Sequence, residues 1–340
     1  MKYRIGRLGG AGIVPVCLAV GVMRVYRRTC RPASLLCVVL FIVTSHGMLQ
    51  AQVVAGPDRP AEVPEGYVIT PFGYFDPSCV LRLAEGETLL TGGRVQHADG
   101  TTELNPAVCN YPHYTPTGLL VAKGATKVSG PNTPNVNGWL EAVSVATGES
   151  YGEIIATWGV PPTPATDDGQ TLFLFPGLED INDVQSILQP VLQWYTPGPW
   201  AIASWNCCLN GIAVESTPLD VSPGDTILGT ITSSCAAGSL TCAIWNVKSE
   251  DVSTGKSTTL SKTPSDGQEW NWAFAAVLEV YGVVNCNDYP AGKSIAFSTT
   301  VYDQNLKTIS YPGWSGSLPT VTPPCNYGVS MTAKNMTLSY

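Results

Sequence analysis

The chain is a series of short apolar runs separated by turns. Four of these runs are SYGEIIATWGV (150–160), TLFLFPGL (171–178), VQSILQPVLQW (184–194) and NWAFAAVLEVYGV (271–283). Turn-forming sequences such as SPGD and STGK stand between runs, and no apolar repeat with the period of a helix is sustained. The pattern predicts an all-β fold, a two-sheet antiparallel β-sandwich or jelly roll preceded by a small N-terminal segment.

The run at residues 184–194 carries a glutamine at every fourth position. Strand side chains alternate between two faces, so Gln185, Gln189 and Gln193 share one face while the even-numbered positions face a core. We expect the three glutamines to face water or a ligand, as the floor of a groove. The alternative is a polar outer face of a sandwich with no binding role.

The run at residues 271–283 carries one carboxylate, Glu279. Alternation places it on a face with Ala273, Ala275 and Val277, whose small side chains leave room for a ligand. Partial desolvation there would raise the pKa of Glu279 towards values useful in acid or base catalysis. We expect most other carboxylates after residue 114 to lie in loops such as LEDIND (178–183). The alternative for Glu279 is a half-buried residue bonded to a neighbouring strand.

Amino-acid composition and its variation along the sequence divide the chain into three parts. With 34 Gly, 27 Pro and 13% charged residues, it suits short strands joined by turns. Residues 1–52 are predicted to be a signal or targeting segment, residues 53–136 a propeptide-like or accessory segment, and residues 137–340 the β-sandwich domain. The last boundary follows a stretch rich in Gly, Pro and Asn (123–138), which is typical of a linker.

The first 52 residues have the order of a secretory signal. They hold seven Lys or Arg and no acidic residue, and the apolar run at 33–43 precedes a small residue at Ala51. We therefore expect export to an extracellular location, with translation starting at Met1 or Met23. An uncleaved membrane anchor is the alternative, although neither this run nor a weaker apolar run at 11–22 reaches the roughly 20 residues of a spanning helix.

Removal of the signal leaves eleven Lys and Arg against 26 acidic residues, a net charge of −15. Nucleic acid is therefore not expected as a partner, nor is a membrane once the signal is gone. Eight cysteines remain, and an even number in an exported chain predicts disulfides. We expect Cys79 to pair with Cys109, and Cys235 with Cys242 would close a hairpin.

From residue 114 onward the chain has no His and no Arg, and only eight Lys against eighteen carboxylates. A Ser-His-Asp or Cys-His nucleophilic site cannot be assembled there, and histidine-ligated zinc is excluded. We expect neither a metal nor another cofactor. Any chemistry in this domain then uses carboxylates, amides and hydroxyls.

These features resemble the glutamic peptidases called eqolisins. The resemblance covers about residues 137–305 and rests on ILQ (187–189), the strand with Glu279, SPGDTILGTIT (222–232), STGKS (253–257), NGWLEAVSV (137–145) and IIATWGVPPTP (154–164). The tract LEVYGVVN (278–285) is more distantly similar to the neprosin peptidases, which pair two glutamates.

The resemblance implies a concanavalin-like jelly roll whose site pairs Gln189 with Glu279. In that chemistry Glu279 takes a proton from water, the water attacks the scissile carbonyl, and the Gln189 amide orients the water and stabilises the oxyanion. Such a site works best in acid. Glu269, in the chain's one Glu-Trp pair, is the alternative carboxylate.

The sequence thus predicts a secreted, monomeric, acid-acting endopeptidase-like protein. Its polypeptide substrate would contact Gln185, Gln193, Trp205 and Tyr281. This requires the amide of Gln189 and the carboxylate of the strand glutamate on neighbouring strands of one concave sheet. The alternative is a non-catalytic carbohydrate-binding module, in which the glutamines and aromatic rings bind a glycan. Whether the chain is an enzyme stays open on sequence alone.

Overall fold

The computed structural model describes residues 59–104, 109–121, 137–182, 184, 186–208, 211–239, 241–318 and 325–340. All of them belong to a unit formed by residues 50–340, which is distinct from a unit formed by residues 1–49. The predicted signal segment, nearly all of the predicted linker and Gln185 lie outside the described residues.

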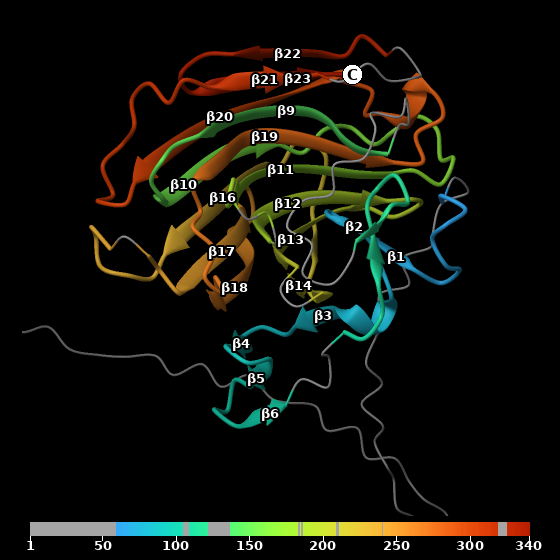
Figure 1. Ribbon diagram of the computed structural model, residues 1–340. Helices are drawn as coiled ribbons and strands as arrows, with labels where there is room; N and C mark the ends of the chain where they lie inside the picture. Colours follow the sequence, from blue (N-terminus) through green and yellow to red (C-terminus); the bar gives the residue numbers. More distant parts are fainter. Residues whose placement is uncertain are drawn as a thin grey trace, which may run out of the picture. The chain divides into compact units, whose positions relative to one another are not determined.

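Two large sheets form the body of the described unit (Figure 1). In spatial order, the nine-stranded sheet contains β21 (Ser315–Ser317), β9 (Gly138–Ala146), β19 (Trp272–Tyr281), β11 (Thr171–Glu179), β12 (Ile187–Tyr195), β13 (Trp200–Cys207), β14 (Ala213–Ser216) and β3 (Val80–Leu83), with β15 (Leu219–Asp220) paired to β13. The seven-stranded sheet contains β18 (Lys256–Pro264), β17 (Ile244–Asp251), β16 (Thr226–Ser233), β10 (Tyr151–Gly159), β20 (Ser294–Asp303), β23 (Asn335–Ser339) and β22 (Gly328–Met331). Neighbouring strands are antiparallel, apart from the parallel pair β14 and β3.

Residues 59–121 make up the N-terminal segment, which supplies β3 to the nine-stranded sheet and forms two small sheets of its own. One contains β1 (Val68–Thr70), β2 (Gly73–Phe75), β7 (His113–Tyr114) and β8 (Leu120–Val121); the other contains β4 (Thr88–Leu90), β5 (Arg94–Gln96) and β6 (Thr102–Leu104). Among the described residues, the 3-10 helices η1 (Pro77–Cys79) and η3 (Cys286–Asp288) span one turn each. Within the described ranges, no helix has the length and apolar character needed to cross a bilayer.

The two large sheets pack face to face through the even-numbered side chains of β12 and β13. Leu192 shares a buried apolar cluster with Ile227 of β16. The hydroxyl of Ser204 lies 3.1 Å from that of Ser249 on β17, so the contact between the sheets also includes a pair of polar side chains. This arrangement follows from the strand alternation, and the predicted β-sandwich is confirmed.

The ladder between β11 and β12 is interrupted in its middle. Cα pairing stops at Leu174 and resumes at Leu178, where a bulge at Gly177 also shifts the register with β19. Pro190 lies opposite this break. Because proline has no N–H to donate, the break accommodates it without losing a ladder hydrogen bond. Gln189 therefore stands where the regular ladder is open, the kind of position at which bulges re-aim side chains.

Four disulfides link all eight cysteines that follow the predicted signal: Cys79–Cys109, Cys207–Cys208, Cys235–Cys242 and Cys286–Cys325. The predicted pairs Cys79–Cys109 and Cys235–Cys242 are confirmed. The pairing of the adjacent residues Cys207 and Cys208, whose peptide bond is cis, was not expected from the sequence. The first disulfide lies within the N-terminal segment and the others lie within residues 137–340.

The contact between Gly229 and Pro190 predicts that Gly229→Ala destabilises the sandwich. The added Cβ would lie 2.6 Å from Pro190 Cγ and 2.9 Å from Trp158 Cη2, so a ring on each sheet must move. Overpacking of this kind costs about 1–3 kcal/mol. Gly159→Ala is the matched control, because the nearest atom to its added Cβ is Asp225 O at 4.0 Å. Urea denaturation should show a lower midpoint for Gly229→Ala alone, and equal midpoints for the two variants would contradict the packing argument.

Candidate functional site

Five of the residues singled out in the sequence lie on the outer face of the nine-stranded sheet, which is the face turned away from the seven-stranded sheet. They are Gln189 and Gln193 of β12, Trp205 of β13, and Glu279 and Tyr281 of β19. All five are buried, since the hairpin of β1 and β2 lies against this face (Figure 1). The expectation that the glutamines face water is therefore wrong: protein covers Gln189 and Gln193.

The carboxyl group of Glu279 is fully buried between two hydrogen-bonding partners. Tyr281 Oη lies 2.6 Å from one of its oxygens, and Trp139 Nε1 donates to the other at 3.1 Å. Burial raises the pKa of Glu279 to about 8, and the hydrogen bonds from Tyr281 and Trp139 oppose the rise. In this covered state the carboxyl is therefore uncharged at acidic and neutral pH.

The hydroxyl of Tyr281 also lies 3.1 Å from the carbonyl oxygen of Thr70 in the hairpin. A hydroxyl has one hydrogen, so it cannot donate fully to both the carbonyl and Glu279. A protonated Glu279 removes the conflict, because it donates to Tyr281 Oη and leaves the phenol hydrogen for Thr70. The raised pKa and the geometry thus agree on a neutral carboxyl that reaches the hairpin through Tyr281.

Gln189 is the second polar side chain under the hairpin. Its Nε2 donates to the carbonyl oxygen of Pro71 at 3.3 Å, while its Oε1 is buried with no hydrogen-bond partner among the described residues. Gln193 is held differently, because Trp205 Nε1 donates to its Oε1 at 3.2 Å. Of the glutamines that the structure describes in this run, Gln189 is the one that bonds to the hairpin backbone.

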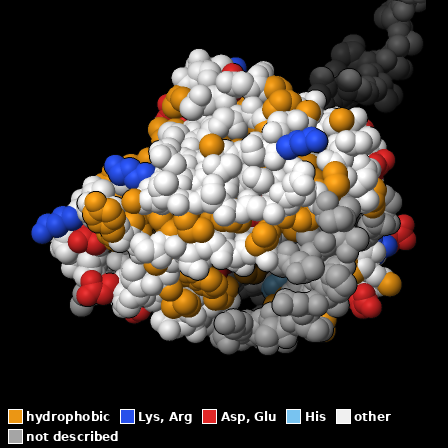
Figure 2. Space-filling model, turned by 90° about the horizontal axis from the view of Figure 1, so that it is seen from above, with side chains coloured by type: hydrophobic (Ala, Val, Ile, Leu, Met, Phe, Trp, Pro, Cys, Tyr) orange, Lys and Arg blue, Asp and Glu red, His pale blue; other side chains and the backbone are white. Residues whose placement is uncertain are grey.

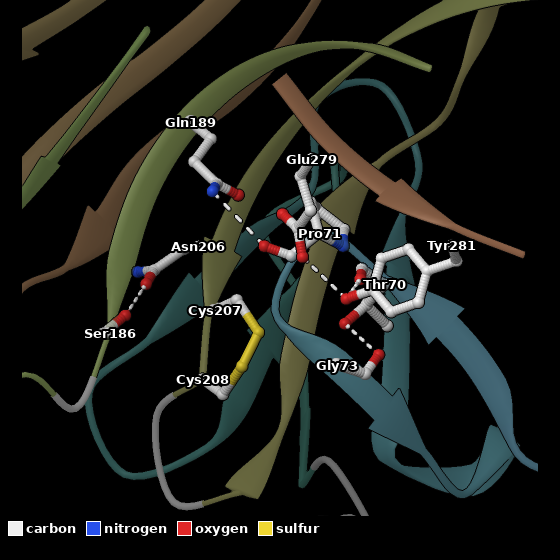
Figure 3. Close-up of a disulfide and its surroundings, with 10 residues drawn as sticks. All are labelled: Thr70, Pro71, Gly73, Ser186, Gln189, Asn206, Cys207, Cys208, Glu279 and Tyr281. Atoms are coloured by element: carbon white, nitrogen blue, oxygen red, sulfur yellow. Dashed lines mark hydrogen bonds between the residues drawn. A yellow bond between two sulfur atoms is a disulfide. The ribbon is translucent and has the colours of Figure 1, made fainter. Parts of the chain in front are cut away.

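Three consecutive carbonyl groups of the hairpin accept hydrogen bonds from the outer face. Tyr195 Oη donates to Ile69 O at 3.4 Å, Tyr281 Oη donates to Thr70 O at 3.1 Å, and Gln189 Nε2 donates to Pro71 O at 3.3 Å. Figure 3 shows the last two, with Gln189 and Tyr281 approaching the Thr70–Pro71 dipeptide from different strands. The side chains of the outer face therefore bind the carbonyl oxygens of a polypeptide backbone.

The registers separate Gln189 from Glu279. Strand β11 lies between their strands, and Glu279 is opposite Phe173, which is in turn opposite Gln193. Gln189 lies four positions further along β12. The expected placement on neighbouring strands is therefore wrong. The two side chains share one face and are linked through the hairpin, where Tyr281 bonds one carbonyl and Gln189 bonds the next.

A bulge in β19 changes which residues share the face of Glu279. The register with β9 shifts between Phe274 and Ala276, and Phe274 packs edge-on against Trp139 with ring centroids 4.7 Å apart. Ala275 belongs instead to the cluster between the two sheets. The face predicted to carry small side chains is therefore partly aromatic, with Trp139 supplying both a ring and an N–H donor.

The alternative carboxylate, Glu269, is exposed in the loop before β19, so the geometry favours Glu279. The expectation that the other carboxylates lie mainly in loops is wrong for Glu141, Glu179 and Glu215, which are buried within strands. Burial raises the pKa of Glu179 to about 8, and the charge that Glu279 carries once it ionises adds to the rise. The apolar run before Glu179 was a usable signal, because it predicts that the strand continues up to that carboxylate.

Glu215 is paired with an arginine of the N-terminal segment. Arg82 donates from Nε at 2.8 Å and from Nη2 at 2.6 Å to the same carboxylate oxygen of Glu215. Burial raises the pKa of Glu215 to about 7, and the charge and hydrogen bonds of Arg82 oppose the rise. The two residues are directly in register on the parallel strands β14 and β3.

Other kinds of site find little support in the part of the chain that the structure describes. No group of three or more His, Cys, Asp or Glu side chains in it is placed to hold a metal ion. Figure 2 shows one face of the molecule, on which most of the described surface is uncharged and the Lys, Arg, Asp and Glu side chains lie scattered, mainly towards its margins. On that face, the described residues form no continuous charged surface for a highly charged ligand.

No protein-family model matches the chain, and no curated protein matches it. Among solved structures it is similar to a scytalido-glutamic peptidase with a peptide-based transition state analog, at 16% identity and a TM-score of 0.47, over 60% of this chain and 98% of that chain. It is also similar to SCP-B, a member of the eqolisin family of peptidases in a complex with the tripeptide Ala-Ile-His, at 16% identity and a TM-score of 0.44 over the same shares of the two chains. Both similarities are distant.

Burial of Glu279 predicts a specific dependence of stability on pH. Its folded pKa of about 8 lies above its ordinary value of 4.5, so its contribution to stability is greatest below pH 4.5 and is lost as pH rises towards 8. Each pKa unit corresponds to about 1.4 kcal/mol, so the loss amounts to a few kcal/mol. Glu279→Gln should therefore lose less stability than the unmodified chain between pH 5 and pH 8.

Thermal denaturation of the two proteins across this range measures the difference. Glu269→Gln serves as the control, because it removes an exposed carboxylate of the loop before β19. If the stability of the unmodified chain and of Glu279→Gln changed with pH in parallel, the raised pKa of the buried carboxyl would be contradicted.

Proposed function

We propose that the protein is an exported endopeptidase whose peptide-binding face is covered by its own N-terminal segment. The observation that carries the proposal is the row of three hydrogen bonds from Tyr195, Tyr281 and Gln189 to consecutive backbone carbonyls. Backbone carbonyls are common to all polypeptides, so a face that binds them suits a polypeptide ligand of varied sequence. The resemblance of the sequence to the glutamic peptidases supports the same substrate class.

The same row favours a polypeptide over a glycan. A carbohydrate-binding module would present free hydroxyl-binding groups beside an open aromatic platform. Here the indole N–H of Trp205 is taken up by Gln193, and the aromatic rings near Glu279 pack against one another. The polar groups that reach the hairpin are those of Tyr195, Tyr281 and Gln189, and they bond backbone carbonyls.

In the proposed mechanism Glu279 and Gln189 act on a substrate that replaces the hairpin. Ionised Glu279 takes a proton from water, and the resulting hydroxide attacks the carbonyl carbon of the scissile peptide bond. Gln189 Nε2 donates to the oxyanion that forms, as it now donates to Pro71 O. Protonated Glu279 then gives its proton to the leaving nitrogen, the C–N bond breaks, and a carboxylic acid and an amine result.

Tyr281 and Tyr195 hold the substrate in position for this step. Tyr281 bonds the carbonyl one residue before the one bound by Gln189, and Tyr195 bonds the carbonyl before that. These contacts fix the direction and register of the bound chain across β12 and β19. Tyr281 also orients the carboxyl of Glu279, since its hydroxyl lies 2.6 Å from that group.

The N-terminal segment keeps the site latent for three reasons. It excludes water, and the burial it imposes keeps the Glu279 carboxyl protonated and unable to accept a proton. Moreover, Thr70 to Gly73 form a tight turn, closed by a hydrogen bond of 3.1 Å from Thr70 Oγ1 to Gly73 O, rather than an extended strand. We therefore assign residues 53–136 a propeptide-like role, with activation by removal of this segment.

Hydrolysis of a denatured protein by the uncovered chain tests the proposal. A site for a specific protease placed between Val121 and Asn137 allows the folded chain to be cut there. Cleavage should then be strongest in acid, and both Glu279→Gln and Gln189→Ala should reduce it by about 100-fold or more. Glu269→Gln is the control and should keep full activity. Absence of hydrolysis from pH 2 to pH 8 after cutting, with the fold intact, would refute the endopeptidase proposal.

The hairpin also predicts a variant that activates the uncut chain. Gly73 has φ +119°, and an added Cβ would lie 2.1 Å from the carbonyl oxygen of Tyr114, so Gly73→Ala must displace the hairpin. The uncut variant should hydrolyse protein several-fold faster than the unmodified chain. Gly92→Ala is the control, because Gly92 also has a positive φ, +85°, but nothing lies within 4 Å of its added Cβ. Equal rates for both variants would mean that the hairpin does not limit access.

A further inference from the structure

The edge of the nine-stranded sheet is completed by the N-terminal segment. Strand β3 is the last strand in the order and pairs in parallel with β14, from Ala213 with Val80 to Ser216 with Leu83. If the N-terminal segment leaves, β14 loses this partner, and the N–H and C=O groups on that side of it become free. An open edge of this kind binds an extended peptide by adding it as a further strand.

A buried carboxyl group that pairs with an arginine lies at the centre of the same edge. Glu215 is 3% exposed, whereas the Arg82 side chain that neutralises it is 32% exposed and approaches from the N-terminal segment. Above about pH 7, where Glu215 is ionised, loss of Arg82 would leave a carboxylate at a site that pairs with a cation, and an uncompensated buried charge is strongly unfavourable. The edge therefore selects a new occupant that brings a positive charge.

The geometry of the pair favours arginine over lysine. Two N–H groups of one guanidinium, Nε and Nη2, bond the same oxygen of Glu215 at 2.8 Å and 2.6 Å. The planar guanidinium holds these donors in a fixed arrangement, while an ammonium group is a single point charge. The neighbours of Arg82 are also informative, because Leu83 is buried and Leu81 packs against the same apolar cluster. The occupant is thus an apolar–arginine–apolar strand.

The edge lies in the same row of the sheet as the amide of Gln189. Glu215 is in register with Trp205, which is in register with Gln189, so two strand spacings, about 10 Å, separate Glu215 from Gln189. A polypeptide added to β14 would therefore lie beside the face that binds backbone carbonyls. No disulfide joins the N-terminal segment to residues 137–340, so the exchange needs no reduction.

We propose that the edge of β14, with Glu215 at its centre, binds an extended arginine-containing strand of the polypeptide substrate once β3 has left it. The N-terminal segment then occupies two parts of the substrate site at once. Its hairpin covers the carbonyl-binding residues, and its β3 strand fills the arginine site. This inference rests on the proposed function, because it names a feature of the polypeptide that the same sheet takes.

A fluorescent peptide tests the site without any need for hydrolysis. Its sequence is PSSVLRLAEG, which matches residues 77–86 with serine in place of Cys79. The protein is the full chain cut between Val121 and Asn137, and fluorescence anisotropy reports binding in competition with the N-terminal segment. The arginine peptide should bind at least tenfold more tightly than the same peptide with citrulline, which keeps the shape of arginine and removes its charge.

Substitutions in the protein provide the second arm. Glu215→Gln should lower affinity for the arginine peptide at least tenfold and leave the citrulline peptide nearly unaffected, whereas Asp220→Asn removes an exposed carboxylate of neighbouring β15 and should change neither. Equal binding of the two peptides by the unmodified protein, or no binding of the arginine peptide at a large excess, would overturn the proposal. Charge-dependent binding without Glu279-dependent hydrolysis would instead leave the arginine site standing and refute the endopeptidase proposal.

Discussion

The arrangement of this protein depends on the need to satisfy polar side chains that lie on a dry sheet face. Gln189, Tyr281 and Glu279 are buried on the outer face of the nine-stranded sheet, where an unpaired amide, phenol or carboxyl is costly. The carbonyls of Thr70 and Pro71 meet that need for Tyr281 and for the Gln189 N–H, while Oε1 of Gln189 stays without a partner among the described residues. The hairpin is therefore held by the same groups that we propose to bind the polypeptide substrate.

Burial of carboxyl groups also sets the electrostatics of the nine-stranded sheet. Glu179, Glu215 and Glu279 all have raised pKa values, and in each case loss of contact with water is the main cause. These carboxyl groups bind protons more tightly when the face is covered than when it is open. The covered state is therefore favoured as pH falls towards the ordinary pKa of a carboxyl. His113 acts in the opposite sense, because burial lowers its pKa to about 4. Acid therefore acts on the cover through two opposed sets of groups, and chemical removal of the segment is a more direct route to an open site.

The fold was predictable because strand alternation is a local property of the sequence. The runs with Gln189 and Glu279 formed strands as expected, and both residues lie on the outer face. What could not be predicted is non-local. The bulges at Gly177 and after Phe274 shift the registers by one residue, and this decides which side chains face each other across three strands. The four-residue strand with Glu215 is too short for a period to be read, and its partner Arg82 lies far away in the chain.

The distribution of the disulfides determines how the N-terminal segment is attached to the rest of the protein. Cys79–Cys109 closes a loop wholly inside that segment, and the other three bridges stay inside residues 137–340, so one peptide linkage is the sole covalent connection between the two parts. While that linkage is intact, the hairpin meets its site at the millimolar effective concentrations typical of a short tether, whatever the amount of protein. Once the linkage is cut, the same contacts must hold at the concentration of the surroundings. Dilution would then decide whether the face stays covered.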